Sequence, residues 1–198
     1  MNLYFSVILR PELAPPRAPE LTLVAAVAGV EALRALGAAA EIKWPNDLVI
    51  GERKVGGILT ELSSDPDRIH FAVLGMGVNL NGSPSQSSPE LAGRATCVAE
   101  ATGKTVRRAH FAVDLWLRLE SWLDLHAEEG FSRVRDAWRE SCATLRNKVS
   151  VETGTQPIVG IAEDIDESGA LLLRTEDGGL QRIFAGDVEY IRPWAKQQ

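Results

Sequence analysis

The sequence predicts an α+β fold in which a mixed β-sheet is packed by helices and followed by a small all-β module. Short β-type segments and one apolar helix fill roughly the first eighty residues, and further helical segments follow. After Leu145 the pattern changes to short β runs separated by glycine-containing turns. This change predicts two domains, residues 1–145 and residues 146–198.

The composition is that of a globular protein with a sizeable core, since 45% of the 198 residues are hydrophobic and 24% are charged. The net charge of -6 and the lack of a Lys/Arg cluster argue against nucleic-acid binding, which depends largely on neutralising phosphates. No apolar run reaches the length of about 18 residues that a membrane span needs, and the start does not resemble a signal peptide.

The cysteines and histidines show no metal-site spacing. Cys97 and Cys142 are far apart and lack a CxxC pattern, so we expect reduced thiols in a cytoplasmic protein. His70, His110 and His126 also lack ligand spacing, and no tightly bound zinc is expected.

The first expected element is a strand over Asn2–Arg10, in which leucine, phenylalanine and valine alternate on one face. The other face is only half polar, which predicts an interior strand. After a proline-rich loop, an apolar helix is expected over Leu21–Leu36, ended by Gly37 and packed against the sheet.

The remaining elements are predicted from the periodicity of hydrophobic residues and from turn-forming residues. Expected strands of the first domain are Glu41–Trp44, Asp47–Ile50, Lys54–Leu62 and Ile69–Leu80. After a polar loop over Ser83–Glu90, the expected helices are Ala95–Thr102, Ala109–Glu129 and Ser132–Leu145. The last β runs, Val149–Val151, Ile158–Ile161, Ala170–Arg174 and Gln181–Phe184, have hairpin spacing and indicate a small SH3-like β-barrel.

The most informative segment begins at Lys43-Trp44-Pro45-Asn46-Asp47. Pro45 interrupts the strand and leaves Asn46 and Asp47 at an exposed junction. A hairpin then returns the chain, so Lys54 can approach Asp47 across paired strands. Gly56 and Gly57 follow inside a strand, where glycine suggests close approach to the backbone. Such a group suits an anionic ligand, although spacing alone equally allows a tight hairpin closed by an exposed salt bridge.

The second segment continues a buried strand as Gly75-Met76-Gly77-Val78-Asn79. Gly75 and Gly77 lie on one face and leave a strip of bare backbone, and Asn79 offers a donor and an acceptor that suit an adenine edge. Close packing of the sheet is an equally good explanation of the two glycines.

Together, these two segments and Lys54-Val55-Gly56-Gly57-Ile58-Leu59 resemble the catalytic-domain signature of biotin protein ligases. The resemblance extends to Asn2–Ser6, to the Cys142–Leu145 junction, and to turns at Ile165–Leu171 and Ala185–Val188. It implies a class II synthetase-like biotin/lipoate ligase catalytic fold with a C-terminal SH3-like domain. Lipoate ligases share the catalytic fold but differ in the Trp-Pro-Asn-Asp segment and the tail.

The resemblance implies that ATP and biotin are substrates, with Mg²⁺ as cofactor. Biotin would pass through biotinyl-5′-AMP to a lysine of the biotin carboxyl carrier domain of acetyl-CoA carboxylase or a related carboxylase. A homodimer is compatible with this family, whereas nucleic acid and membrane are not expected partners.

The resemblance also implies roles for individual residues. Lys54 would be the catalytic cation, and Asp47 would organise Mg²⁺ or orient the incoming amine. Lys43 would be a second positive group or a structural residue, and Trp44 would lie under the ligand or in the core. The implied substrate-binding residues are Lys43, Trp44, Asn46, Gly56, Gly57, Gly75, Gly77 and Asn79.

One family feature is absent from the sequence. A Gly/Arg-rich loop and a Ser/Thr-Asn segment that hold biotin should precede Tyr4, and Arg107-Arg108 is no substitute because glycines do not flank it. We therefore expect an N-terminally truncated catalytic fold with an exposed sheet edge at Asn2–Arg10. Three alternatives stay open: part of a working ligase, a shortened inactive homologue, or a module that only binds carrier protein or nucleotide.

Overall fold

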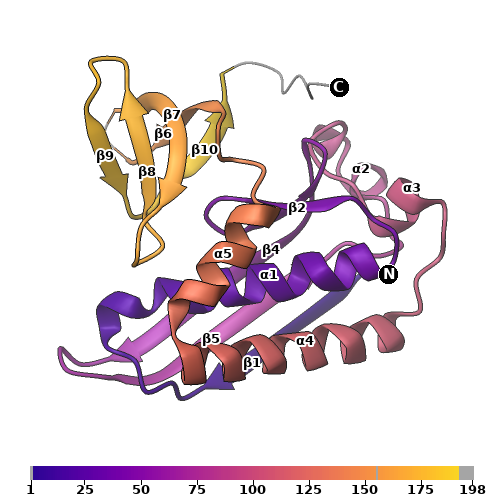
Figure 1. Cartoon of the computed structure of the whole chain (residues 1–198). Helices are drawn as coiled ribbons and strands as arrows, with labels where there is room; N and C mark the ends of the chain where they lie inside the picture. The colour runs from indigo at the N-terminus through magenta and orange to yellow at the C-terminus, as the bar shows by residue number, and fades with distance from the viewer. Residues whose placement is uncertain (1, 155, 192–198) are drawn as a thin grey trace.

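The computed structural model describes residues 2–154 and 156–191. It contains two five-stranded antiparallel sheets, with three longer helices packed on one face of the first sheet and the second sheet forming a separate unit beyond α5 (Figure 1). The predicted α+β class, a helix-packed sheet followed by a β module, is confirmed.

The first sheet is built from the strands that carry both sequence motifs. Its strands are β1 (Leu3–Leu9), β2 (Ala40–Lys43), β3 (Asp47–Ile50), β4 (Arg53–Ser64) and β5 (Ile69–Val78). They pair in the order β1-β5-β4-β3-β2, and each neighbouring pair is antiparallel. Two isolated bridges run parallel, Ile42 with Cys142 and Lys54 with Ala95. This order places the two motif strands, β4 and β5, side by side.

The helices cover one face of this sheet. Helix α1 (Pro19–Ala35) is rich in Ala, Leu and Val and is buried over most of its length, between the sheet and the helices α4 (Arg108–Glu129) and α5 (Phe131–Ser141). Pro19 suits the first turn, where no helical N–H bond is needed, and Gly37, with φ 86°, follows the last turn. The apolar helix predicted over Leu21–Leu36 therefore forms the centre of the core.

Strand β1 lies at an edge of the sheet, where β5 is its one paired neighbour among the described residues. Its outward face stays open, since Tyr4 is 73% and Ile8 is 58% exposed. On the helix side, Phe5 packs edge-on against Trp116 of α4. The interior position predicted from the half-polar face is wrong, and the exposed edge expected at Asn2–Arg10 is present.

The second sheet follows the junction after α5. Its strands are β6 (Lys148–Glu152), β7 (Ile158–Ile165), β8 (Leu171–Thr175), β9 (Leu180–Ile183) and β10 (Asp187–Tyr190), paired in the order β10-β6-β7-β8-β9. This small antiparallel module is compatible with the predicted SH3-like domain. Strand β10 lies where the sequence suggested only a turn, and it pairs with β6.

Several boundaries differ from the sequence-based expectation. Helix α3 spans only Val98–Thr102, and α5 ends at Ser141 because the next residues are extended and Ala143 N donates to Ile42 O at 2.8 Å. The polar loop contains two short turns of helix, α2 (Pro84–Ser87) and η2 (Pro89–Leu91), and η1 (Pro15–Arg17) precedes α1. None of the described helices is both long and apolar enough to span a membrane.

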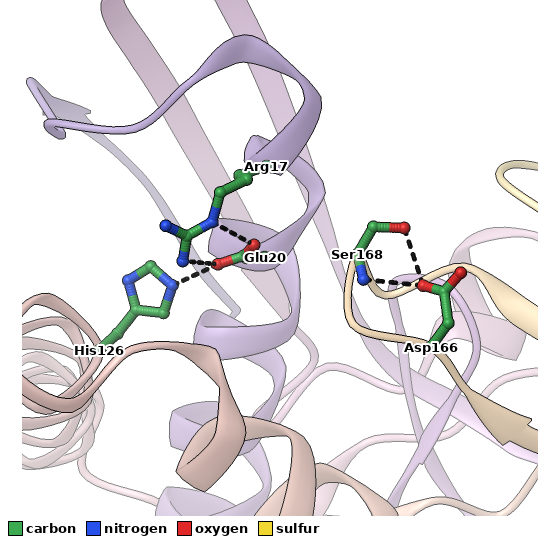
Figure 2. A network of polar contacts seen from close by, with 5 residues as sticks. All are labelled: Arg17, Glu20, His126, Asp166 and Ser168. Carbon is green, nitrogen blue, oxygen red and sulfur yellow. Dashed lines mark hydrogen bonds and ion pairs between the residues drawn. The ribbon is translucent and has the colours of Figure 1, made fainter.

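A buried polar network joins the start of α1 to the end of α4 (Figure 2). Glu20 is only 1% exposed; it accepts two bonds from Arg17, at 2.7 and 2.9 Å, and lies 2.6 Å from His126 Nε2. Burial alone would raise the pKa of Glu20, but the hydrogen bonds from His126 and Arg17 outweigh it and lower that pKa. The network therefore ties two helix ends together without an unpaired buried charge.

The second sheet contacts the first domain through the turn between β7 and β8. Asp166 accepts bonds from the main chain and hydroxyl of Ser168, both at 2.8 Å, which shapes this turn (Figure 2). The turn ends at Gly169, whose carbonyl accepts the indole N–H of Trp44 at 3.2 Å. Arg139 of α5 adds two bonds to Asp164, at 2.6 and 2.7 Å.

Candidate active site

An open cavity of about 600 Å³ lies over the motif strands, on the sheet face opposite the helices. Strands β1, β4 and β5 form its floor, and the segment after β5 forms a wall. The lining residues are Asn2, Tyr4, Lys54, Gly56, Gly57, Gly77, Asn79, Gly82, Ser83, Pro84, Ser88, Leu91 and Ala95. Residues that were predicted from separate motifs are thus brought to one concave surface.

Lys54 and Asp47 form an ion pair at this surface. Their Nζ and Oδ1 atoms are 2.5 Å apart, and the lysine side chain is 50% exposed. The β3–β4 pairing shifts register between Leu48 and Val49, so Lys54 shares a face with Gly57, which pairs with Asp47. The predicted approach of the two residues across a hairpin is present, with a cation accessible to a ligand.

The glycines of the motifs serve two purposes. A Cβ on Gly56 would lie 2.7 Å from the carbonyl oxygen of Gly77, so this glycine is required by sheet packing. A Cβ on Gly57 would instead meet the mobile end of the Lys54 side chain at 3.1 Å, and one on Gly77 would meet the Tyr4 ring at 3.1 Å. At Gly75 a Cβ would make only ordinary contacts, at 3.6 Å and beyond. Gly57 and Gly77 therefore keep the cavity open.

Asn79 lies at the far end of the cavity, where its amide bonds to protein groups. Its Nδ2 donates to Thr96 O at 3.1 Å, and its Oδ1 accepts a bond from Asn2 Nδ2 at 3.3 Å. The side-chain Oδ1 of Asn2 in turn accepts bonds from the main-chain N–H groups of Leu80 and Gly82. Contact of Asn79 with an adenine ring stays a prediction, and its observed contacts fix the strand end beside the cavity.

Lys43, Trp44 and Asn46 contact other parts of the protein, and neither they nor Gly75 line this cavity. Lys43 Nζ lies 5.9 Å from the centre of the Tyr190 ring in β10. Trp44 is buried and bonds to Gly169, and Asn46 Nδ2 donates to Ile58 O at 2.7 Å. Trp44 and Asn46 line a different cavity of about 310 Å³, between β4 and the second sheet. This placement favours the core alternative for Trp44 and the structural alternative for Lys43.

Sequence reasoning missed the residues that shape the wall of the cavity. Glu100 accepts bonds from Ser83 Oγ at 2.7 Å and Thr96 Oγ1 at 3.1 Å, and these contacts lower its pKa with the Ser83 bond contributing most. A signal was present, because Glu100 stands three residues after the Cys97 N-cap of α3, as glutamate does in a capping box. Cysteine in place of the usual serine or threonine obscured that pattern.

The described residues do not form a metal site of their own. They contain no group of three or more His, Cys, Asp or Glu side chains arranged to hold a metal ion. Asp47, the residue predicted to organise Mg²⁺, is paired with Lys54. A protein-held Mg²⁺ is therefore not supported by this geometry, and no chemical step below depends on one.

Comparison with known proteins assigns the family. Residues 1–79 match the biotin/lipoate A/B protein ligase family, and residues 148–190 match the biotin protein ligase C-terminal domain. A biotin–[acetyl-CoA-carboxylase] ligase from Paracoccus denitrificans is 38% identical over 195 residues, covering 94% of this chain and 79% of that protein. The chain therefore belongs to the biotin protein ligase family.

Two further relatives show how much of the family architecture is shared. The bifunctional ligase/repressor BirA of Bacillus subtilis is 34% identical over 189 residues, and the chain spans only 58% of its length. A biotin protein ligase from Aquifex aeolicus in complex with biotin and ATP superimposes with a TM-score of 0.79 at 29% identity, covering 96% of this chain and 78% of that chain. The similarity thus includes both sheets.

Proposed function

We propose that this chain carries the reacting centre of a biotin protein ligase, which attaches biotin to a lysine of a biotin carboxyl carrier domain in an ATP-dependent reaction. The observation that supports this proposal most directly is the Lys54–Asp47 pair at the glycine-lined cavity. The similar Aquifex aeolicus structure, a complex with biotin and ATP, supports the same two substrates. The Paracoccus denitrificans relative supports a carrier domain of acetyl-CoA carboxylase as acceptor.

In the first half-reaction, a carboxylate oxygen of biotin attacks the α-phosphorus of ATP. The bond from this phosphorus to the bridging oxygen breaks, pyrophosphate leaves, and biotinyl-5′-AMP forms. Negative charge is concentrated where the two anionic substrates meet. Lys54 is the cation that we assign to this point, because its ammonium group is exposed on the cavity floor between Gly57 and Asp47.

In the second half-reaction, the neutral ε-amine of the acceptor lysine attacks the acyl carbon of biotinyl-5′-AMP. The carbon–oxygen bond to AMP breaks, AMP leaves with the electron pair, and the new amide loses one proton. Asp47 is the carboxylate available beside Lys54 to orient the incoming amine. Biotin would lie along Gly57 and Gly77, where the absence of side chains leaves the strand backbone open.

The test is a biotinylation assay with the purified chain, ATP, biotin and a carrier domain, with the labelled product detected by streptavidin. Lys54→Ala should lower the initial rate about 10²- to 10³-fold, as expected when a charge that stabilises the transition state is removed. Lys104→Ala is the matched control, because Lys104 lies outside the cavity, and it should keep the rate of the parent chain.

Two results would contradict the proposal. An unchanged rate in the Lys54→Ala variant would remove the assigned catalytic role. A chain that binds ATP or carrier domain but forms no labelled product would instead be the binding module considered as the alternative. The homodimer and the cytoplasmic location stay predictions that size-exclusion chromatography and cell fractionation can test.

A further inference from the structure

The wall of the cavity is a partly exposed segment that follows β5. Gly82, Ser83, Pro84, Ser88 and Leu91 of this segment line the cavity opposite Tyr4 and Gly77. The segment contains only the short turns α2 and η2, and it has little regular structure to hold its shape. Main-chain N–H groups of Arg94 and Ala95 donate to Leu91 O and hold its far end, whereas side-chain contacts attach its start to the rest of the fold.

Glu100 supplies one such attachment from outside the wall. One carboxylate oxygen accepts the hydroxyl of Ser83 at 2.7 Å, and the other accepts the hydroxyl of Thr96 at 3.1 Å. Hydrogen bonds to an ionised carboxylate are stronger than those between neutral groups. The bond from Ser83, more than any other contact, lowers the pKa of Glu100, because it favours the ionised carboxylate.

Thr96 connects this attachment to the reacting lysine. Its side chain is fully buried, and its main-chain N–H donates to Lys54 O at 2.9 Å. The N–H of Lys54 donates in turn to Arg94 O at 2.9 Å, so Lys54 and the segment Arg94–Thr96 are paired through the parallel bridge at Ala95. A single carboxylate thus joins the wall to the strip of backbone that holds Lys54.

We propose that Glu100 is a positioning residue that fixes the Ser83–Leu91 wall beside Asn79, the residue that is predicted to face the adenine ring and that is bonded to Thr96. This inference rests on the proposed function, since it takes the bound nucleotide to be ATP or the adenylate. Glu100 is not among the residues that line the cavity, so we do not expect it to touch a bound nucleotide. It acts through Ser83, and its loss should weaken nucleotide binding more than it slows the chemical step.

Four variants separate this role from a general contribution to α3. Ser83→Ala removes the bond to Glu100 together with the contact to Ser85 inside the wall, and Glu100→Ala removes both bonds to the carboxylate. Thr102→Ala is the matched control: its hydroxyl donates to Val98 O at 2.8 Å within α3, so the variant weakens the same helix without touching the wall. Glu100→Gln keeps an acceptor oxygen and should restore part of the binding.

The experiment measures the Kd for ATP by calorimetry and the KM and kcat in the biotinylation assay, using the full chain. Ser83→Ala and Glu100→Ala should raise Kd and KM for ATP about fivefold to tenfold, as expected for loss of a hydrogen bond to a charged group, and should leave kcat within about twofold. Hydrogen exchange should accelerate at residues 82–91 in both variants, and Thr102→Ala should show neither effect.

The possible failures are distinguishable. Equal ATP affinity in the parent chain and both variants, or an equal loss in Thr102→Ala, would overturn the positioning role while leaving the proposed function intact. Equal losses in kcat and kcat/KM would also overturn it, because they would indicate a direct part in chemistry. A parent chain that binds no ATP would overturn the proposed function and this inference together.

Discussion

The two ends of one motif differ in what they contact. Lys54 and Gly57 lie on an open cavity. A few residues earlier in the chain, Trp44 is buried and bonds to Gly169 in a turn of the second sheet, and Asn46 bonds to the main chain of Ile58 in β4. A recognisable sequence signature therefore combines residues that can meet substrate with residues that hold two domains together. Similarity in sequence alone does not separate these two roles, but burial and hydrogen bonding do.

The largest expected effect is the loss of stability when the packing of Trp44 is removed. Trp44→Ala should lower the free energy of unfolding by about 3–5 kcal/mol, because a fully packed indole is removed. Trp44→Phe should cost only about 1–2 kcal/mol, since it mainly removes the bond to Gly169. Urea unfolding followed by circular dichroism measures both, with the half-exposed Trp116→Ala as a control of small effect. If Trp44→Phe raised the KM for biotin and left the stability unchanged, we would conclude that Trp44 contacts the ligand.

A neighbouring pair of glycines gives the next test. Gly56→Ala should destabilise the fold by about 1–3 kcal/mol, because its Cβ would lie against backbone and the sheet cannot yield. Gly57→Ala should change stability by less than about 0.5 kcal/mol, since only the end of the Lys54 side chain must move. Thermal unfolding and the biotinylation assay should separate the two variants. Gly56→Ala should have a lower Tm, and Gly57→Ala should have a lower biotinylation rate. A lower Tm in Gly57→Ala and a lower rate in Gly56→Ala would show that we have assigned the two faces of β4 the wrong way round.

The last prediction concerns how acidic pH changes the stability of the fold. Burial would raise the pKa of Asp166, but the bonds from Ser168, Arg182 and the Ala170 main chain outweigh it and lower that pKa. The carboxylate therefore stabilises the fold above its unfolded pKa of about 3.9, and this contribution of about 1 kcal/mol is lost as the pH falls through the lower folded value. Asp166→Asn should be less stable than the parent chain at pH 6, and the difference should shrink below pH 4 in urea titrations. A constant difference would exclude this carboxylate as the titrating group.

Much of the fold follows from local pattern. The apolar helix, the β3–β4 hairpin and the approach of Lys54 to Asp47 depend on period, on turn residues and on spacing, all of which are visible in the sequence. The edge position of β1 does not follow from its own residues, because it is determined by which strands are available to pair with it. The burial of Trp44 depends on a turn more than a hundred residues away, and no local rule predicts such a contact.

The site was predictable to a similar degree. The sequence identified Lys54, Gly57 and Gly77, which line the cavity, but it also grouped Lys43 and Asn46 with them. It missed Asn2 and Glu100 because their partners are main-chain groups and hydroxyls brought near only by folding. Resemblance to a family indicates which residues matter, whereas the contacts indicate what each of them does.

The register shift between β3 and β4 makes the site sensitive to length as well as to composition. Lys54 and Gly57 are separated by an odd number of steps, and a regular strand would direct them to opposite faces. The single extra residue corrects this parity. Inserting one further residue between them, with the bulge kept, would turn the lysine toward the helices while every motif residue remained in the gene. Insertions in this hairpin should therefore abolish activity more completely than most substitutions, and a designer seeking an inactive but folded scaffold could begin there.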